Sequence, residues 1–566
     1  MGTGSVVIRK IHAFLLWLNF YFEHSLLYRG VVAVKSASSG SLILRGFLST
    51  DHRDYWQGSL IMRAIGFFAS AVICGVRWIF RAVAHANENS VNKKVFDFFM
   101  KTRGADGKGF WGFWAKTVHG CAPVRLAKWF FGAETTDGIS DCPRIAFIES
   151  ANSINVISGQ RLSLASLFNL KVWYMLFLMG ALMIPSQFWN NMYLLFSAFF
   201  FAGCFAVKWF LDKDSPVRPS FAHISPALVL FVFFCALSIF TGYGGSDSVR
   251  VFVIFFACVV HSVLVALIFK SREDLRMFFL VMSVALVGIV LFGFYQLFMG
   301  IEISAEMTDL GVNPGLARLY STMGNPNNDA QAWAMLIPFV LAVTITTKCD
   351  VKRLLLMGVL ALVIAAFAMT YSRAGYVALM AGIGVFVLMS APRLVPIALI
   401  ALVFALPFIP AGIIERLFTL GQDTSSQYRF MIWSGVLRML EDFWVQGIGM
   451  GPAAFVRIYR SYAHELAERS MHAHNQFLDI LAHSGIGALL AFLAYLFRLF
   501  KRVIAEHFVS TNQEQKVYIS AWVAALAVFV VFGVGEYVWF HPRVMLVFWV
   551  VAGVVAGMAS MKTCEG

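Results

Sequence analysis

Two histidines and an asparagine mark the point where a polar segment of this chain enters a long apolar run: His472, His474 and Asn475. An asparagine directly before an apolar run is typical of a helix N-cap. The N-terminus of a helix carries partial positive charge, which disfavours a protonated imidazole. A histidine held neutral there suits a general base. We predict this role for His474, supported by His472 and Asn475. Hydrogen bonding of both rings to loop carbonyls is the alternative.

Three arginines could bind a phosphate group: Arg318, Arg373 and Arg429. Arg373 stands in a turn so short that its guanidinium must lie near the rim of a membrane, and Arg429 has apolar neighbours on both sides. Arginine matches phosphate bidentately and keeps its charge. Together these arginines could therefore clamp a diphosphate without a metal ion.

Each of these arginines alone has a simpler explanation, which is an ion pair with a lipid headgroup or with a carboxylate such as Glu441 or Asp442. The asparagines before the sixth apolar run also have two interpretations. Helix capping is one, since Pro326 follows Asn325 and proline favours the first helical position. A contact between Asn327 and a sugar is the other.

Composition places these residues in a membrane protein. Of the 566 residues, 59% are hydrophobic and 13% are charged, whereas a soluble domain has about 25% charged residues. Continuous apolar runs of about 20 residues, enough to cross a hydrocarbon core of roughly 30 Å, predict an all-α polytopic fold and exclude a β-barrel. We expect about twelve spans, at residues 167–184, 188–207, 222–241, 250–269, 276–298, 330–347, 354–371, 374–390, 394–413, 475–498, 517–534 and 544–560.

The distribution of basic residues predicts how these spans are oriented. The connections on one side hold fifteen Lys and Arg residues, and the short connections on the other side hold four. The positive-inside rule makes the richer side cytoplasmic, so both termini are expected in the cytoplasm. The outer side then carries residues 299–329, the 371–375 turn and the long loop 414–473, in which we expect short amphipathic helices.

Residues 1–166 form a separate basic extension with 19 Lys and Arg against 10 Asp and Glu. This excess fits cytoplasmic retention and contact with anionic headgroups. Nucleic-acid binding is not expected, because no stacking motif or recognition helix accompanies the charge. The apolar stretches 13–22 and 59–80 are too short or interrupted by charge, which predicts interfacial helices. Residues 167–566 then form the transmembrane domain.

Several motifs, each short, occur together in one order along the chain. Their residues are Tyr371-Ser-Arg-Ala-Gly-Tyr376, Arg429-Phe-Met-Ile-Trp433 followed by Gly447-Ile-Gly-Met-Gly451, His472-Ala-His-Asn-Gln-Phe-Leu478 followed by Gly485-Ile-Gly487, and more weakly Gly324-Asn-Pro-Asn327. In this combination the chain resembles the O-antigen ligase-like family of bacterial inner-membrane proteins over roughly residues 167–560. That family contains lipopolysaccharide O-antigen ligases, O-antigen polymerases and protein O-oligosaccharyltransferases.

The resemblance implies a glycan donor carried on undecaprenyl diphosphate and an active site that faces the periplasm. It implies that His474 is the catalytic base and that Arg373 and Arg429 bind the diphosphate. Arg318 is added from its residue type and position, and Asn327 as a supporting residue. No cofactor is expected, and no metal ion either, because the outer connections lack the carboxylate cluster of a magnesium site.

The three kinds of family member differ in the acceptor that receives the glycan. A protein acceptor usually accompanies a further periplasmic domain, and only residues 562–566 follow the last predicted span. We therefore predict an O-antigen ligase acting on a lipid A-core acceptor, with the polymerase and the protein transferase as alternatives. A transporter for lipid-linked sugars is the alternative of another class. It would need polar residues near the middle of the spans, where His261 stands largely alone.

Overall fold

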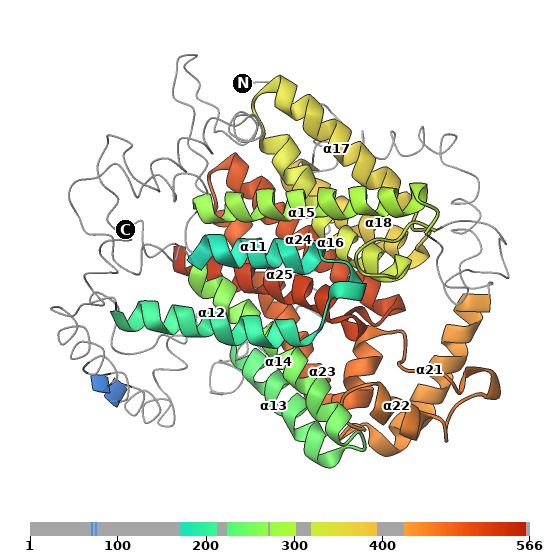
Figure 1. Cartoon of the computed structure of the whole chain (residues 1–566). Helices are drawn as coiled ribbons and strands as arrows, with labels where there is room; N and C mark the ends of the chain where they lie inside the picture. Colours follow the sequence, from blue (N-terminus) through green and yellow to red (C-terminus); the bar gives the residue numbers. More distant parts are fainter. Residues whose placement is uncertain are drawn as a thin grey trace, which may run out of the picture.

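The computed structural model describes residues 170–211, 224–269, 272–301, 318–392 and 424–561, and five helical positions between 70 and 78. All regular secondary structure in these ranges is helical (Figure 1). The predicted all-α class is therefore confirmed for this part of the chain. Nearly all of the basic extension lies outside it, so its interfacial helices stay a prediction.

The helices follow one another along the chain as a series of apolar segments broken by short connections. They are α11 (Leu170–Met183), η1 (Ser186–Phe188), α12 (Met192–Leu211), α13 (Pro226–Thr241), α14 (Ser246–Ile268), α15 (Arg272–Phe298), α16 (Pro326–Thr346), α17 (Asp350–Ala368), α18 (Arg373–Ser390), α21 (Thr424–Phe443), α22 (Pro452–Tyr459), η5 (Glu465–Ala467), α23 (Gln476–Val509), α24 (Gln513–Gly535), η6 (Val538–Phe540) and α25 (Pro542–Met561).

Eleven of the twelve predicted spans coincide with a helix. Seven of these helices, α14 to α18 with α23 and α24, are long and apolar enough to cross a membrane. The helices α11, α12, α13 and α25 are apolar but shorter over the residues described. The predicted span at 394–413 lies outside the described residues. The chain is a multi-pass membrane protein, while the count of twelve stays a prediction.

The centre of the bundle lies between α15, α16 and α24, which pack through aromatic rings. The ring of Trp522 on α24 lies 4.7 Å from that of Phe339 on α16 and 5.0 Å from that of Phe279 on α15. These three side chains are fully buried. In contrast, α17 and α18 leave much of their apolar surface open, as helices that face lipid do.

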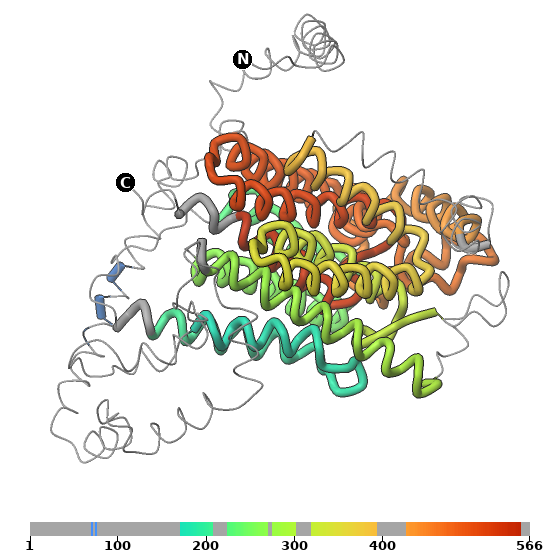
Figure 2. Tube along the Cα trace, turned by 90° about the horizontal axis from the view of Figure 1, so that it is seen from above, coloured from blue at the N-terminus to red at the C-terminus, as the bar shows by residue number. Residues whose placement is uncertain are grey.

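The connections that the sequence assigns to the outer side meet at one end of the bundle. The N–H of Tyr243 donates to the carbonyl of Ile448 at 2.7 Å, and the N–H of Leu319 donates to that of Met369 at 2.8 Å. At this end lie α21 and α22, which are the α-helices described in the long loop (Figures 1 and 2). Helices in the loop were expected and are present, whereas the side of the membrane that they face stays a prediction.

The helix α23 is interrupted at Gly485, where φ is 75°. The carbonyls of Ala482 and His483 at this break accept hydrogen bonds from outside the helix, from the N–H groups of Ile448 at 2.8 Å and Gly449 at 3.0 Å. The glycine-rich run after α21 is thus a backbone insert that fixes the first half of α23. Its glycines permit this close approach of backbone to backbone, because they carry no Cβ.

Replacing Gly485 with alanine should destabilise the protein strongly. A Cβ at this position would lie 2.0 Å from the carbonyl oxygen of Val445, and its positive φ costs a non-glycine residue about 1–3 kcal/mol. We expect the thermal midpoint of the purified protein in detergent to fall by several degrees. Gly358→Ala on α17 is the matched control, since a Cβ there meets nothing within 4 Å. Equal midpoints for the two variants would contradict the inserted-loop geometry.

Candidate functional site

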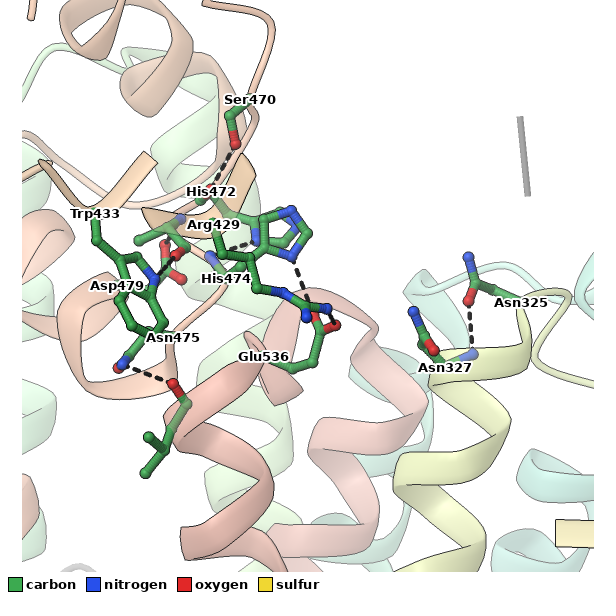
Figure 3. A network of polar contacts seen from close by, with 12 residues as sticks. Asn325, Asn327, Arg429, Trp433, Ser470, His472, His474, Asn475, Asp479 and Glu536 are labelled. Atoms are coloured by element: carbon green, nitrogen blue, oxygen red, sulfur yellow. Dashed lines mark hydrogen bonds and ion pairs between the residues drawn. The ribbon is translucent and has the colours of Figure 1, made fainter. Parts of the chain in front are cut away.

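A buried carboxylate at the end of α24 joins two of the predicted site residues. The Nδ1 atom of His474 lies 3.0 Å from Oε2 of Glu536, and Nη2 of Arg429 donates to Oε1 of the same side chain. Figure 3 shows both side chains converging on Glu536 from above. Residues 429, 474 and 536 lie on three separate elements, so this cluster exists only in the folded chain.

The electrostatics of the cluster keep the Glu536 carboxylate ionised. The side chain of Glu536 is 8% exposed, whereas those of Arg429 and His474 are 20% and 28% exposed. Burial alone raises the pKa of Glu536, but attraction to Arg429 and His474 outweighs burial and lowers the pKa to about 2. An ionised carboxylate can only accept hydrogen bonds, so Nδ1 of His474 must donate. A neutral His474 therefore carries its lone pair on Nε2, which is the form that a general base requires.

The backbone before α23 is held in place from two sides. Oδ1 of the buried Asp479 accepts from the N–H of Ala473 at 3.0 Å, and Nε1 of Trp433 on α21 donates to the carbonyl of Ala473 at 2.9 Å. The next residue, His474, has a φ of 47°, a conformation that few residues other than glycine adopt. Clamping of Ala473 thus maintains a strained backbone that presents the His474 ring to Glu536.

Asn475 is the N-cap of α23, as the sequence predicts. Its side-chain oxygen accepts from the N–H groups of Phe477 and Leu478, both at 3.0 Å. Its Nδ2 donates to the carbonyl of Val534 at 2.9 Å, near the end of α24. Asn475 therefore ties the start of α23 to the helix end that carries Glu536.

His472 packs against His474, and the hydrogen bonds of the two rings differ. The ring centroids of the two histidines are 4.0 Å apart, and Phe540 covers His472 at 4.5 Å. Nδ1 of His472 accepts from the N–H of His474 at 3.2 Å. Burial, followed by the nearby His474, lowers the pKa of His472 to about 3. Its ring is thus neutral with the proton on Nε2, and its only lone pair is already in use. Of the two histidines, His474 is the one suited to be a base.

The buried, neutral ring of His472 predicts that the folded protein loses stability in acid. The pKa of His472 is near 6.5 in the unfolded chain and about 3 in the folded protein. The stability that the neutral ring contributes is therefore fully present above about pH 6.5. It is lost as the pH falls toward 3. Lowering the pH from 7 to 5 should cost at most about 2 kcal/mol at this residue. Thermal unfolding in detergent should show a smaller acid shift for His472→Asn than for the unaltered protein. The same shift in both would contradict the buried neutral ring.

The remaining predicted residues gather around the turn before α18. Nε of Arg318 donates to the carbonyl of Thr370 at 2.9 Å, and its Nη2 donates to Oδ1 of Asn327 at 2.9 Å. Asn327 thus positions an arginine in the structure. Its neighbour Asn325 is the N-cap of α16, which confirms the capping interpretation. Asn325 and Asn327 lie at the start of the helix that packs against α24 (Figure 3).

Arg373 is the first residue of α18, and the residue after it lies beside the end of α24. A Cβ added to Gly535 would lie 3.7 Å from Cβ of Ala374. Gly535, the residue before Glu536, therefore lies close to Ala374, the residue after Arg373. The start of α18 thus lies beside the end of α24 that carries Glu536.

The sequence did not identify Glu536, and the carboxylates considered as alternative partners of Arg429, such as Glu441 and Asp442, lie close to it in the chain. Instead the partner lies 107 residues away. One signal could have found it: Glu536 is the only acidic residue in the connection between the last two predicted spans, on the same predicted side as the arginines. Among the described residues, no group of three or more His, Cys, Asp or Glu side chains is arranged to hold a metal ion.

Comparison with known proteins bears on the same region of the chain. Residues 357–493 match the family model described as O-Antigen ligase. This confirms the resemblance to the O-antigen ligase-like family, whose members are membrane glycosyltransferases and ligases. No curated protein matches the chain. The matched segment contains Arg373, Arg429 and His474 but ends before Glu536.

Proposed function

We propose that the protein transfers a glycan from an undecaprenyl diphosphate carrier to a lipid A-core acceptor, as an O-antigen ligase. The observation that carries this proposal is the sharing of Glu536 by His474 and Arg429. It supports a proton-accepting imidazole and a phosphate-binding guanidinium side by side at one end of the bundle. The predicted outer face of the inner membrane, toward the periplasm, is the side on which this reaction would occur.

In this proposal the donor's diphosphate binds between Arg429 and Arg373. Arg429 bonds to Glu536 at the end of α24, and Arg373 begins the helix whose second residue lies close to Gly535. Both arginines lie in the segment that matches the family model. The N-terminus of α18 adds partial positive charge at Arg373, which favours an anion there. Arg318 would support the same anion from the far side of the turn. The prenyl chain would then lie along apolar helices in the membrane.

The chemical step is a single displacement. Nε2 of His474 removes the proton from an acceptor hydroxyl, whose oxygen forms a bond to the anomeric carbon of the donor sugar. The bond from that carbon to the phosphate oxygen breaks, and its electron pair leaves with undecaprenyl diphosphate. The anomeric centre is inverted, and the arginines stabilise the charge that develops on the departing phosphate. Glu536 stabilises the imidazolium that His474 becomes.

The test is reconstitution of the purified protein in liposomes with a lipid-linked glycan and lipid A-core. Ligated lipid A-core glycan is the expected product on gels. A lengthened donor without ligation would show an O-antigen polymerase instead, and glycan attached to added acceptor protein would show a protein transferase. Movement of the donor across the bilayer with no transfer would show a transporter. The buried His261 gives little support to that last outcome, because its ring bonds to Tyr174 and Ser197.

Arg373→Ala should lower transfer by about 10²–10³-fold, which is the effect of removing one group that stabilises developing charge. Arg373→Lys should recover little of it, because lysine keeps the charge but lacks the planar fork. Initial rates in the reconstituted assay measure both. Arg438→Lys is the matched control, since Arg438 is exposed on α21 and bonds only to the carbonyl of Tyr462 in the described residues. Full rescue by Arg373→Lys would contradict bidentate binding.

A further inference from the structure

His472 has a nitrogen whose function the fold leaves open. Its Nδ1 is occupied by the N–H of His474. No described residue bonds to its Nε2, which carries the proton of the neutral ring. The ring itself is only partly exposed. The protein therefore places one N–H donor, Nε2 of His472, directly beside His474, its candidate base.

Three neighbouring rings and one backbone hydrogen bond fix the orientation of the His472 ring. His474 and Phe540 cover it at 4.0 and 4.5 Å between ring centroids, and Tyr537 lies at 5.7 Å. The hydroxyl of Ser470 donates to the carbonyl of His472 at 2.7 Å, which holds its backbone. Because burial lowers the pKa of His472 to about 3, the ring stays a neutral donor throughout the ordinary pH range.

Sugars present their hydroxyl groups in neighbouring pairs. Two imidazoles in contact, one that accepts a proton and one that donates a hydrogen bond, match such a pair of oxygens. The aligned pair would orient the attacking oxygen as well as deprotonate it, and orientation of this kind contributes to catalysis.

We propose that His472 is a substrate-positioning residue whose Nε2–H donates a hydrogen bond to the acceptor sugar, at an oxygen next to the hydroxyl that His474 deprotonates. This role rests on the proposed transferase function and names a contact to its acceptor. His472 itself removes no proton, since its lone pair is held by the backbone of His474.

Two amide substitutions separate this role from a purely structural one. In His472→Asn, the side-chain oxygen replaces Nδ1 and keeps the bond to the N–H of His474, but the distal donor is lost. In His472→Gln, the amide NH₂ replaces Nε2 and keeps the distal donor, but the bond to His474 is lost. The two variants therefore give opposite results under the two roles.

The measurement is the KM for purified lipid A-core at saturating lipid-linked donor, and the KM for the donor at saturating lipid A-core. Loss of one neutral hydrogen bond is worth about 0.5–1.5 kcal/mol, so His472→Asn should raise the acceptor KM about 3- to 10-fold. His472→Gln should keep an acceptor KM close to that of the unaltered protein. The donor KM should stay the same in both variants.

A raised acceptor KM in His472→Gln but not in His472→Asn would overturn the proposal, because it would show that only the bond to His474 matters. Equal acceptor KM values for the two variants, whether raised or unaltered, would overturn it too, as would a change confined to kcat or to the donor KM. If the unaltered protein forms no ligated product, the proposed function fails. A failure of the His472 role alone leaves ligation by the unaltered protein intact.

Discussion

His474→Ala should lower the turnover of glycan transfer by about 10²–10⁴-fold, the usual contribution of a positioned general base. The lone pair on Nε2 is the proton acceptor in the proposed step, and it is available because Nδ1 donates to the buried carboxylate of Glu536 at 3.0 Å. Alanine removes both nitrogens and leaves only water to take the proton. Single-turnover rates with lipid-linked glycan and lipid A-core measure the loss.

The matched control for this substitution is His464→Asn. His464 is exposed in the same loop, and its Nδ1 accepts from the N–H of Leu466, a bond that asparagine can replace. We expect an unaltered rate for this control. A rate for His474→Ala within a few-fold of normal, at equal protein level and equal thermal midpoint, would remove His474 from the chemical step.

Glu536→Gln should lower turnover by about 10²–10⁴-fold with little change in the affinity for the acceptor. A loss of that size follows when a buried carboxylate that orients a catalytic histidine is replaced by its amide. The carboxylate of Glu536 accepts from Arg429 and from His474 at the same time. An amide has one accepting oxygen and one donating nitrogen, so one of the two partners must face a second donor. The result is loss of the His474 tautomer or release of Arg429.

Thermal unfolding should accompany the kinetic assay of Glu536→Gln, because Arg429 then keeps a partly buried charge without its carboxylate. Glu441→Gln is the matched control, since Glu441 is an exposed carboxylate on the same helix as Arg429. It should keep both the rate and the midpoint. Full activity of Glu536→Gln would show that the shared carboxylate only stabilises the fold.

Local patterns in the sequence predicted the elements that carry the site. The continuous apolar runs coincide with helices, because a chain in lipid must satisfy its backbone hydrogen bonds internally. The positions of Asn325 and Asn475 as N-caps were also correct, since capping depends on residues only two or three positions away. The motif around His474 falls within the segment that matches the O-antigen ligase model.

The sequence could not predict which groups meet at the end of α24. Glu536 lies 62 residues from His474 and 107 residues from Arg429, and no periodicity links such positions. The sequence did not predict the break in α23 either. Gly485 leaves the helical conformation because backbone from the glycine-rich run enters there, and that contact depends on where α21 ends in space.

By itself, then, the sequence determined a helical membrane chain and the candidate residues His474, Arg373 and Arg429. Only the tertiary structure decided which of the two histidines can accept a proton. The N–H of His474 occupies Nδ1 of His472, and the carboxylate of Glu536 requires Nδ1 of His474 to donate. The physical reason is that an imidazole's tautomer is set by the hydrogen-bond partners that the folded chain brings to its two nitrogens.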